Sequence, residues 1–539
     1  MSLAVLKTLN KTSFVKIPAL SLLTLALLCL SFPPADLVYL AWVACIPWFI
    51  LIVTGERHLC LYSLGIGVVF FVVQLSWLRH VTFIAWILLS LYCAAYFLIF
   101  ACCARLITSN LKLPIVIVMP CIWTASEFIR SFLMSGFPWF FTGHTQYRYL
   151  PIIQIADIIG VYGISFIIIM VNAAIADLLI RSFTDQRRAF FRLTCILPPV
   201  LVAASILYGL HWLRHYHPEE GPVVCMVQGN IPQDLKFEST EEDEIQILKK
   251  YTDLSMSMKG TPIDLLVWPE TMMPGILNIN PELTGRKIDL LSQLTATSLA
   301  QELNTNLLLG GIALTLAGKE QVYFNSGYYY NRKGTLLNRY DKIHLVLFGE
   351  FTPLKTYFPF LAKLVPYEIG LTHGHERTLF SLNTLQNGNF TFGASICYED
   401  TVPSLIRKFR KDGVGFMVNI TNDGWFRDSA ELDQHLAIMV FRAVENRITM
   451  ARAANTGISS FVAPDGAIYD TLSDPAGKYR EISGTLTNRI KYIKNAASFY
   501  TMYGDWFAIL CTAASGIMLT LGVIKSFVSG TEKPAEKSH

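Results

Sequence analysis

The sequence predicts a two-part fold: an α-helical membrane domain of about eight spans, with an α/β domain inserted before the last span. Of the 539 residues, 53% are hydrophobic and only 16% are charged, against roughly a quarter charged in an average soluble protein. The apolar surplus falls in residues 17–213 and 504–526. Residues 217–498 have the composition of a globular domain and are long enough to bury one large core.

Candidate membrane spans are identified by length and hydropathy. A helix needs about 20 apolar residues to cross the hydrocarbon core of a bilayer. We expect the first apolar run to be a helix rather than a signal peptide, because no A-x-A-like cleavage site follows it. The expected spans are 17–32, 35–53, 61–78, 83–106, 113–132, 158–180, 191–213 and 504–526. The corresponding domains are 1–216 with seven helices, 217–498 with the α/β fold, 499–528 with the last helix, and a tail at 529–539.

The basic residues of the loops predict an orientation in the membrane. Loops and termini on one side hold thirteen Lys and Arg, whereas the short loops on the other side hold four. Since cytoplasmic loops are enriched in these residues, both termini are expected in the cytoplasm and the α/β domain on the outer face. In a bacterium with two membranes, this is a multi-pass inner-membrane protein with a periplasmic domain. A net charge of +4 without a Lys/Arg run argues against nucleic acid as a partner.

Strand-like and helix-like segments alternate within 217–498, which is typical of an α/β domain. Several runs are apolar throughout, as central strands buried on both faces are. The expected strands are 223–228, 264–268, 306–312, 322–330, 390–396, 414–420, 458–463 and 481–486. The expected helices are 240–258, 286–303 and 433–450.

Cysteine usage singles out one thiol. Nine of the 11 cysteines fall in the hydrophobic segments, where they act as small apolar side chains. Of the remaining two, Cys225 lies inside the run VVCMVQ and is expected to be buried in a strand. Two cysteines without CxxC or histidine spacing argue against a disulfide framework and against a zinc site. Cys397 is therefore the candidate nucleophile.

Three reactive side chains lie beside strand-like segments. Glu270 ends the run LLVWPE, Lys342 lies in YDKIHLVLFGE, and Cys397 follows TFGASI. A carboxylate, an amine and a thiol can form the base, the oxyanion clamp and the nucleophile of an acyl transfer. A neighbouring ammonium is expected to lower the pKa of the thiol. Taken singly, each residue type is more often structural or exposed on the surface.

Five motifs in order carry a family resemblance: WPE at 268–270, the segment around Lys342, ICYE at 396–399, NDGWF at 422–426 and RAANTGIS at 452–459. Together they resemble the nitrilase superfamily, which implies an αββα sandwich with a Glu-Lys-Cys triad. The membrane spans on both sides narrow the resemblance, as do VQGNIPQ, HLVLFGEFTPL and SGFPWFFTGHTQY. Over essentially its full length, the chain resembles the membrane-bound apolipoprotein N-acyltransferase family.

The resemblance implies roles for the residues that match the motifs. Glu270 is expected to take the thiol proton of Cys397, while Lys342 and the backbone N–H of Tyr398 hold the tetrahedral oxyanion. Glu350 and Glu399 are expected to support the triad. The alternative for both is a buried carboxylate satisfied by backbone donors or by Lys342. Tyr398 is also a candidate for shaping the pocket.

Further residues near the motifs are weaker candidates for a functional role. Trp425, with Asn422 and Asp423, follows a strand and is expected to form a pocket wall. His435 is a tempting general base, but its segment predicts an amphipathic helix on which it packs or caps. Ser395 is a tempting nucleophile two residues before Cys397.

Aromatic segments are candidates for contact with lipid. Residues 354–367 are expected to form a lid at the membrane interface, or else a buried helix or hairpin. Residues 137–149, with Trp139, are expected to face the active site, or else to form an interfacial belt. Glu127 and Arg130 are spaced to pair with one another. Phe237 stands where the resembled family usually has Trp, so contacts to substrate are expected without an indole N–H.

The function expected from these features is acyl transfer in two steps. A phospholipid acylates Cys397, and the α-amine of a diacylglyceryl-modified N-terminal Cys of a lipoprotein then takes the acyl chain. No metal or cofactor is expected, and the protein is expected to be a monomer. One alternative is a membrane-tethered amidase of the nitrilase type, in which water is the second nucleophile. Another is a transporter or receptor whose outer domain only binds ligand.

Overall fold

The computed structural model describes residues 13–56, 58–183, 190–233, 239–318, 320–346, 349–350, 370–494 and 497–531. The chain forms two compact units. The helical unit comprises Met1–Ser76, Trp86–Trp212 and Asp505–His539. The sheet unit comprises Leu213–Gly504 together with the short segment Trp77–Ala85.

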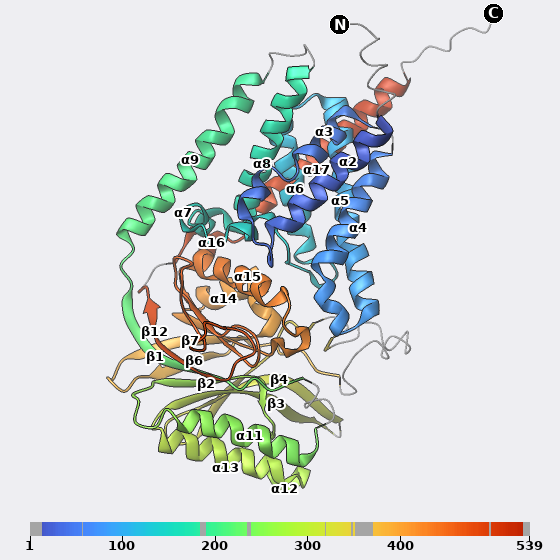
Figure 1. Ribbon diagram of the computed structural model, residues 1–539. Coiled ribbons are helices and arrows are strands. Elements are labelled where there is room, and N and C mark those ends of the chain that lie inside the picture. Colours follow the sequence, from blue (N-terminus) through green and yellow to red (C-terminus); the bar gives the residue numbers. More distant parts are fainter. Residues whose placement is uncertain are drawn as a thin grey trace, which may run out of the picture. The chain divides into compact units, whose positions relative to one another are not determined.

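Apolar helices make up the described part of the helical unit (Figure 1). Four are long and apolar enough to cross a membrane: Phe83–Leu111, Ala156–Arg181, Phe191–His215 and Trp506–Val528. Shorter apolar helical stretches are Ile17–Ser31, Val38–Thr54 and Leu59–Gln74. The elements are α2 (Ser13–Ser31), η1 (Val38–Trp42), α3 (Ile46–Thr54), α4 (Leu59–Gln74), η2 (Ser76–His80), α5 (Phe83–Leu111), α6 (Ile115–Arg130), η3 (Leu133–Ser135), η4 (Thr142–Gln146), α7 (Leu150–Ile153), α8 (Ala156–Phe183), α9 (Phe191–His215) and α17 (Trp506–Thr531). Such helices identify a membrane protein.

One predicted span has a different local structure. Residues 35–53, expected as one helix, form the 3-10 turn η1 followed by the nine-residue helix α3. Pro47 lies in the first turn of α3, where its missing N–H removes no helical hydrogen bond. The break explains why this stretch is shorter than a continuous crossing helix.

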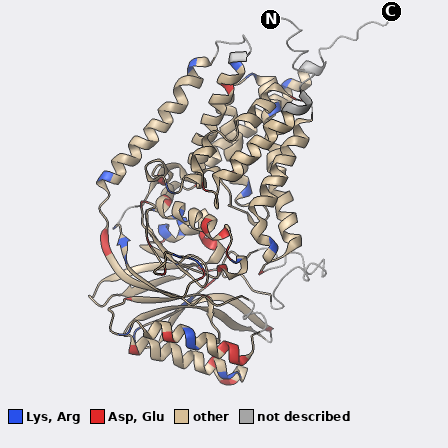
Figure 2. Ribbon diagram, in the orientation of Figure 1, with Lys and Arg blue, Asp and Glu red and all other residues tan. Residues whose placement is uncertain are grey.

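The described helices of the helical unit carry few charged residues, as Figure 2 shows. Glu127 and Arg130 on α6 are both buried. They do not pair as predicted. One Glu127 oxygen accepts from the Thr142 backbone N–H at 2.7 Å and from Trp123 Nε1 at 2.7 Å. Arg130 donates to the backbone carbonyls of Trp139 at 2.6 Å and Phe137 at 3.3 Å. Each charge thus holds the backbone of the 137–142 loop.

Two six-stranded sheets form the centre of the sheet unit, as the αββα expectation requires. The first has the order β12-β1-β2-β3-β4-β5 and the second β11-β10-β9-β8-β7-β6. In the first, β1, β2 and β3 run parallel, and in the second, β7, β8 and β9 do. The strands are β1 (Glu219–Gln228), β2 (Leu265–Met273), β3 (Asn306–Ala317), β4 (Glu320–Tyr330), β5 (Leu336–Asp341), β6 (Leu379–Asn383), β7 (Asn389–Ile396), β8 (Phe416–Thr421), β9 (Thr449–Ala454), β10 (Ser460–Val462), β11 (Ile468–Thr471) and β12 (Gly484–Tyr492).

Helices cover the outer face of each sheet (Figure 1). On the first sheet lie α11 (Glu241–Met256), the short α12 (Pro281–Thr284) and α13 (Lys287–Glu302). On the second lie α14 (Pro403–Lys411) and α15 (Glu431–Asn446), with the short helix α16 (Phe499–Tyr503) against them. Cys225 is fully buried in β1, in the core beneath α11 and α13, as predicted. Burial of these apolar faces is the main stabilising term of the sandwich.

The segment Trp77–Ala85, which holds most of η2 and the first residues of α5, belongs to the sheet unit. The Trp77 ring packs edge-on against Phe426 at 4.8 Å, and its Nε1 donates to Gln434 Oε1 at 3.1 Å. The tryptophan therefore joins helix α15 to the loop that precedes it.

All eight expected strands and three expected helices are confirmed, with small shifts of their ends. Four strands were not predicted: β5, β6, β9 and β11. The expected helix 433–450 ends at Asn446, because Arg447 takes the left-handed conformation and the chain continues into β9. The sequence of β9, TMARAA, has good helix formers, but burial between β8 and β10 decides its structure.

Candidate active site

The base candidate, Glu270, lies at an irregularity in β2. Pairing between β2 and β3 shifts register between Trp268 and Met273, as expected around Pro269, which cannot donate to a ladder. A Cβ on Gly310 would lie 2.2 Å from the Pro269 carbonyl oxygen. Only glycine therefore lets β3 approach the bulge. The carboxylate of Glu270 is buried, and its Oε2 accepts from the Asn422 N–H at 3.0 Å.

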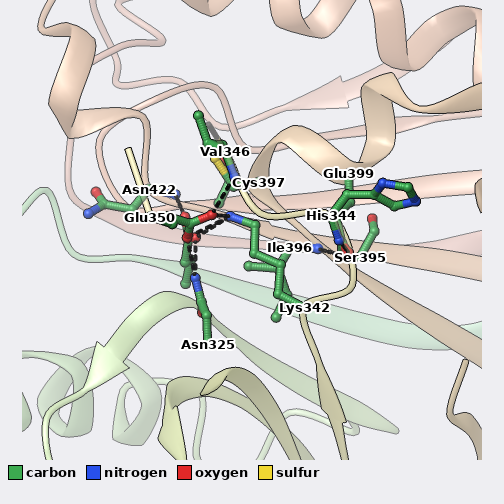
Figure 3. Close-up of polar contacts among 12 residues, drawn as sticks. Asn325, Lys342, His344, Val346, Glu350, Ser395, Ile396, Cys397, Glu399 and Asn422 are labelled. Atoms are coloured by element: carbon green, nitrogen blue, oxygen red, sulfur yellow. Dashed lines mark hydrogen bonds and ion pairs between the residues drawn. The ribbon is translucent and has the colours of Figure 1, made fainter. Parts of the chain in front are cut away.

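Lys342 follows directly after β5 and is 1% exposed. Its backbone is fixed on both sides, since its N–H donates to Asn325 and its carbonyl accepts from Gly374, each at 2.8 Å. The ammonium lies between two carboxylates. It is 3.2 Å from Glu270 Oε1 and 2.9 Å from a Glu350 oxygen, and Figure 3 shows it against Glu350. A buried ammonium with two such partners is held in one position.

Asn325 on β4 completes this group and was missed by the sequence reasoning. Its Nδ2 donates to Glu270 Oε1 at 2.7 Å and to Glu350 Oε1 at 3.0 Å. The amide thus bridges two carboxylates that would otherwise repel each other. The available signal was one amide in the aromatic run VYFNSGYYY, at an inward-facing strand position.

Cys397 begins the 3-10 turn η6 (Cys397–Thr401), directly after β7. Its φ of +53° places it in the left-handed region, which a residue other than glycine rarely adopts outside functional sites. Asn419 on β8 donates to the Cys397 carbonyl at 3.0 Å and to Ser395 Oγ at 3.2 Å. The side chain of Cys397 is half-buried and lies beside Lys342 and Glu350 (Figure 3).

The charges of this group decide its resting protonation. Burial pulls the pKa of Lys342 down, but the carboxylates of Glu270 and Glu350 outweigh it and hold that pKa well above its usual value. Burial, and then the Glu270 charge, raise the pKa of the Cys397 thiol well above its usual value, against the lowering effect of Lys342. Lys342 lowers the pKa of the thiol, as the sequence predicts, but burial and the Glu270 charge outweigh it. A thiol with a raised pKa needs a base before it can act as a nucleophile.

Glu399 fixes the loop that carries Lys342. Its Oε1 accepts from the backbone N–H groups of Ile343 at 2.7 Å and His344 at 2.9 Å, and its Oε2 from that of Ile396 at 2.8 Å. The Tyr340 hydroxyl also donates to it at 2.9 Å. Burial raises the pKa of Glu399 to about 7, although these donors oppose the shift. One carboxylate therefore links the turn that holds Cys397 to the loop that holds Lys342.

Two family models match this chain. The model described as apolipoprotein N-acyltransferase N-terminal domain matches residues 26–174, and the carbon-nitrogen hydrolase model matches residues 224–479. An apolipoprotein N-acyltransferase of Geobacter metallireducens is 34% identical over 524 residues, covering 93% of this chain and 94% of its own. The chain belongs to the apolipoprotein N-acyltransferase family.

Two more distant apolipoprotein N-acyltransferases agree with this membership. The apolipoprotein N-acyltransferase of Pasteurella multocida is 28% identical over 92% of each chain, and that of Bdellovibrio bacteriovorus is 29% identical over 74% of this chain and 72% of its own. Among solved structures, a nitrilase-superfamily protein of Saccharomyces cerevisiae matches with 20% identity and a TM-score of 0.36, covering 51% of this chain and 91% of its own.

The remaining residues suggested by family resemblance fall in different places. Tyr398 and Trp425 are half-buried on η6 and η7 (Asp423–Phe426). Trp139 is buried in the helical unit, with its ring stacked on Phe137 at 5.9 Å. Phe237 and the predicted lid 354–367 lie outside the described residues.

A second buried polar cluster surrounds His435 on α15. Its other members are Asp400, Asp423, Glu431 and Arg452, and all five side chains are buried. Among the described residues, Asp423, Glu431 and His435 also have the spacing of a metal site, with their possible ligand atoms within 4.8 Å of one another. The sequence reasoning placed His435 as a packing or capping residue, and the cluster gives it three carboxylate neighbours.

Proposed function

We propose that this protein transfers an acyl chain from a phospholipid, through a thioester on Cys397, to the N-terminal α-amine of diacylglyceryl-cysteine in bacterial lipoproteins. The observation that carries the proposal is the buried contact between Lys342 and Glu270 beside the half-buried Cys397. Membership of the apolipoprotein N-acyltransferase family supports the choice of donor and acceptor.

In the first half-reaction, the Cys397 sulfur attacks the ester carbonyl of the phospholipid while Glu270 accepts the thiol proton. The ammonium of Lys342 and the backbone N–H of Tyr398 stabilise the tetrahedral oxyanion. Collapse breaks the ester C–O bond, and Glu270 returns the proton to the departing alkoxide. The products are a lysophospholipid and the acyl-thioester of Cys397.

In the second half-reaction, the α-amine of the lipoprotein attacks the thioester carbonyl. Glu270 again acts as base and takes a proton from the amine. Collapse breaks the C–S bond, and the proton returns from Glu270 to the sulfur, which restores the thiol. The burial of Glu270 and Lys342 supports this assignment, because exclusion of water protects a thioester from hydrolysis.

We propose the membrane arrangement that the sequence predicts. The chain crosses the bacterial inner membrane about eight times and works as a monomer, with both termini in the cytoplasm. Residues 217–498 form the periplasmic catalytic domain between the seven helices of 1–216 and the last helix at 499–528, with a cytoplasmic tail at 529–539. Glu350 and Glu399 support the triad, and Phe237, Tyr398, Trp425 and Trp139 contact substrate. The four long apolar helices support a membrane location.

The test is acylation of the purified protein by a phospholipid labelled in its acyl chain. We expect a hydroxylamine-sensitive label on the protein that is absent in Cys397→Ala. A peptide that begins with diacylglyceryl-cysteine should then remove the label and become N-acylated. A protein that takes no label but releases ammonia from simple amides would contradict the proposal and favour the amidase alternative.

A further inference from the structure

His435 lies against the turn that carries the nucleophile. It is 2% exposed, on the second turn of α15. Its Nε2 lies 2.7 Å from Asp400 Oδ1. Asp400 lies three residues after Cys397 in η6, and its other oxygen binds Arg452 on β9. The ring is thus attached to the turn that sets the conformation of Cys397.

The other side of the ring faces the loop that holds the base. Nδ1 of His435 lies 3.6 Å from Asp423 Oδ1 and 3.4 Å from Glu431 Oε1. Asp423 follows Asn422, whose N–H donates to Glu270 at 3.0 Å. Thr421 Oγ1 also donates to Asp423 Oδ1, at 2.7 Å. The imidazole therefore lies between the η6 turn and the loop that anchors the Glu270 carboxylate.

The surroundings of the ring favour a positive charge on it. A neutral imidazole that donates from Nε2 would point the lone pair of Nδ1 at the Asp423 carboxylate, which is repulsive. Burial and Arg452 lower the pKa of His435, but Asp400 and Asp423 outweigh both and hold it well above its usual value. Burial raises the pKa of Glu431 to about 7. Asp400 and Asp423 remain as two carboxylates, and the charges of Arg452 and protonated His435 balance them.

We propose that His435 is a positioning residue, whose imidazole holds the turn of Cys397 and the loop of Asn422 in register so that Glu270 faces the thiol. The proposal rests on the proposed function of Cys397 and Glu270. It assigns the ring no contact with substrate. Asp400 and Asp423 are the two carboxylates through which it acts.

The test compares His435→Gln and His435→Ala with Leu436→Ala, which removes a buried side chain at the next position of α15. We expect both His435 variants to slow formation of the Cys397 thioester about 10- to 100-fold in kcat with little change in KM. Leu436→Ala should remain within about twofold of the wild type at a similar loss of melting temperature. Alkylation of Cys397 by iodoacetamide, followed over about pH 6–9, should shift in the His435 variants alone.

Coupling to Asp400 provides the second readout. The double variant His435→Gln/Asp400→Asn should lose less activity than the two single losses combined, since both substitutions remove the contact between His435 and Asp400. Fully additive losses, or wild-type rates in His435→Gln, would overturn the proposal. A stoichiometric metal ion in the purified protein, whose removal slows the wild type to the same degree, would also overturn it. A wild type that forms no thioester would instead contradict the proposed function, and the alkylation profile would still test His435.

Discussion

The two units of this protein bury the same kinds of charged side chain and use them differently. In the sheet unit, Lys342 contacts Glu270 and Glu350 directly, so one cation faces two anions. In the helical unit, Glu127 and Arg130 lie on one helix turn and bind the backbone of the 137–142 loop. Backbone partners fix a loop in place, whereas partners that are themselves ionisable can exchange a proton during a reaction. Replacing a charged side chain with a neutral one should therefore strongly reduce stability and activity in the group around Lys342. The same change at Glu127 or Arg130 should have a small effect.

Removal of the shared cation should have the largest effect. Lys342→Met leaves Glu270 and Glu350 buried and facing each other, which we expect to cost about 3–5 kcal/mol of stability. Loss of its ammonium as an oxyanion donor should slow thioester formation by at least about 10²–10³-fold. The measurements are the melting temperature and the single-turnover rate. Lys259→Met is the matched control, because its exposed pair with Glu302 is worth under about 1 kcal/mol. Equal losses of melting temperature and rate in Lys342→Met and Lys259→Met would contradict the special role of the buried lysine.

Glu270→Gln should abolish general base catalysis with a smaller effect on stability. The amide oxygen can still accept from Asn422, but it takes no proton, so thioester formation should fall about 10²–10⁴-fold. The Glu270 charge is one cause of the raised pKa of the Cys397 thiol, so Glu270→Gln should lower that pKa. The pH at which Cys397 becomes alkylated should therefore move down in this variant, while thioester formation falls. A rate of thioester formation equal to that of the wild type would rule out Glu270 as the base.

Glu350→Gln should have an intermediate effect. One Glu350 oxygen accepts from Lys342 and Asn325, and the other accepts from the Val346 N–H at 3.0 Å and also lies 2.9 Å from Lys342 Nζ. An amide cannot accept at both ends, so either Asn325 or the Val346 N–H loses its partner, and the contact with Lys342 loses its charge. We expect about a 10- to 100-fold loss in the rate of thioester formation. A variant as active as the wild type would show that Glu270 alone positions Lys342.

Glu127→Gln should have the smallest effect. Three donors reach one oxygen of this carboxylate: Trp123 Nε1, the Thr142 N–H and the Thr142 hydroxyl. An amide oxygen can accept the same bonds, so we expect less than about 1 kcal/mol of lost stability and a rate within about threefold. Thermal unfolding in detergent measures the loss of stability, and the thioester assay measures the rate. A large loss of rate would mean that the charge itself acts in the helical unit.

The sequence predicted the fold further than it predicted the contacts within the site. Apolar β-rich runs identified the central strands, because burial on both faces leaves a continuous signal. The strand β9 was not predicted. Its sequence, TMARAA, has the composition of a helix, and only its neighbours β8 and β10 make it a strand. Local motifs marked Glu270, Lys342 and Cys397 as candidates.

Tertiary pairing decided the rest of the site. Nothing in VYFNSGYYY shows that the Asn325 amide meets two carboxylates from β2 and the Lys342 loop. The net rise in the thiol pKa could not be predicted either, because it depends first on burial and then on the charges that surround the sulfur. His435 was correctly placed on a helix, but its three carboxylate neighbours come partly from residues 12 and 35 positions away.

The contact of Trp77 with Gln434 and Phe426 bears on the order in which the protein is made. Trp77 precedes Gln434 by 357 residues, so a ribosome that adds roughly 5–20 residues per second makes it about 20–70 s earlier. Strands β1 to β8 are synthesised in that interval. The segment that holds Trp77 is thus synthesised well before its partners Phe426 and Gln434. A fragment that begins at residue 213 would lack this contact.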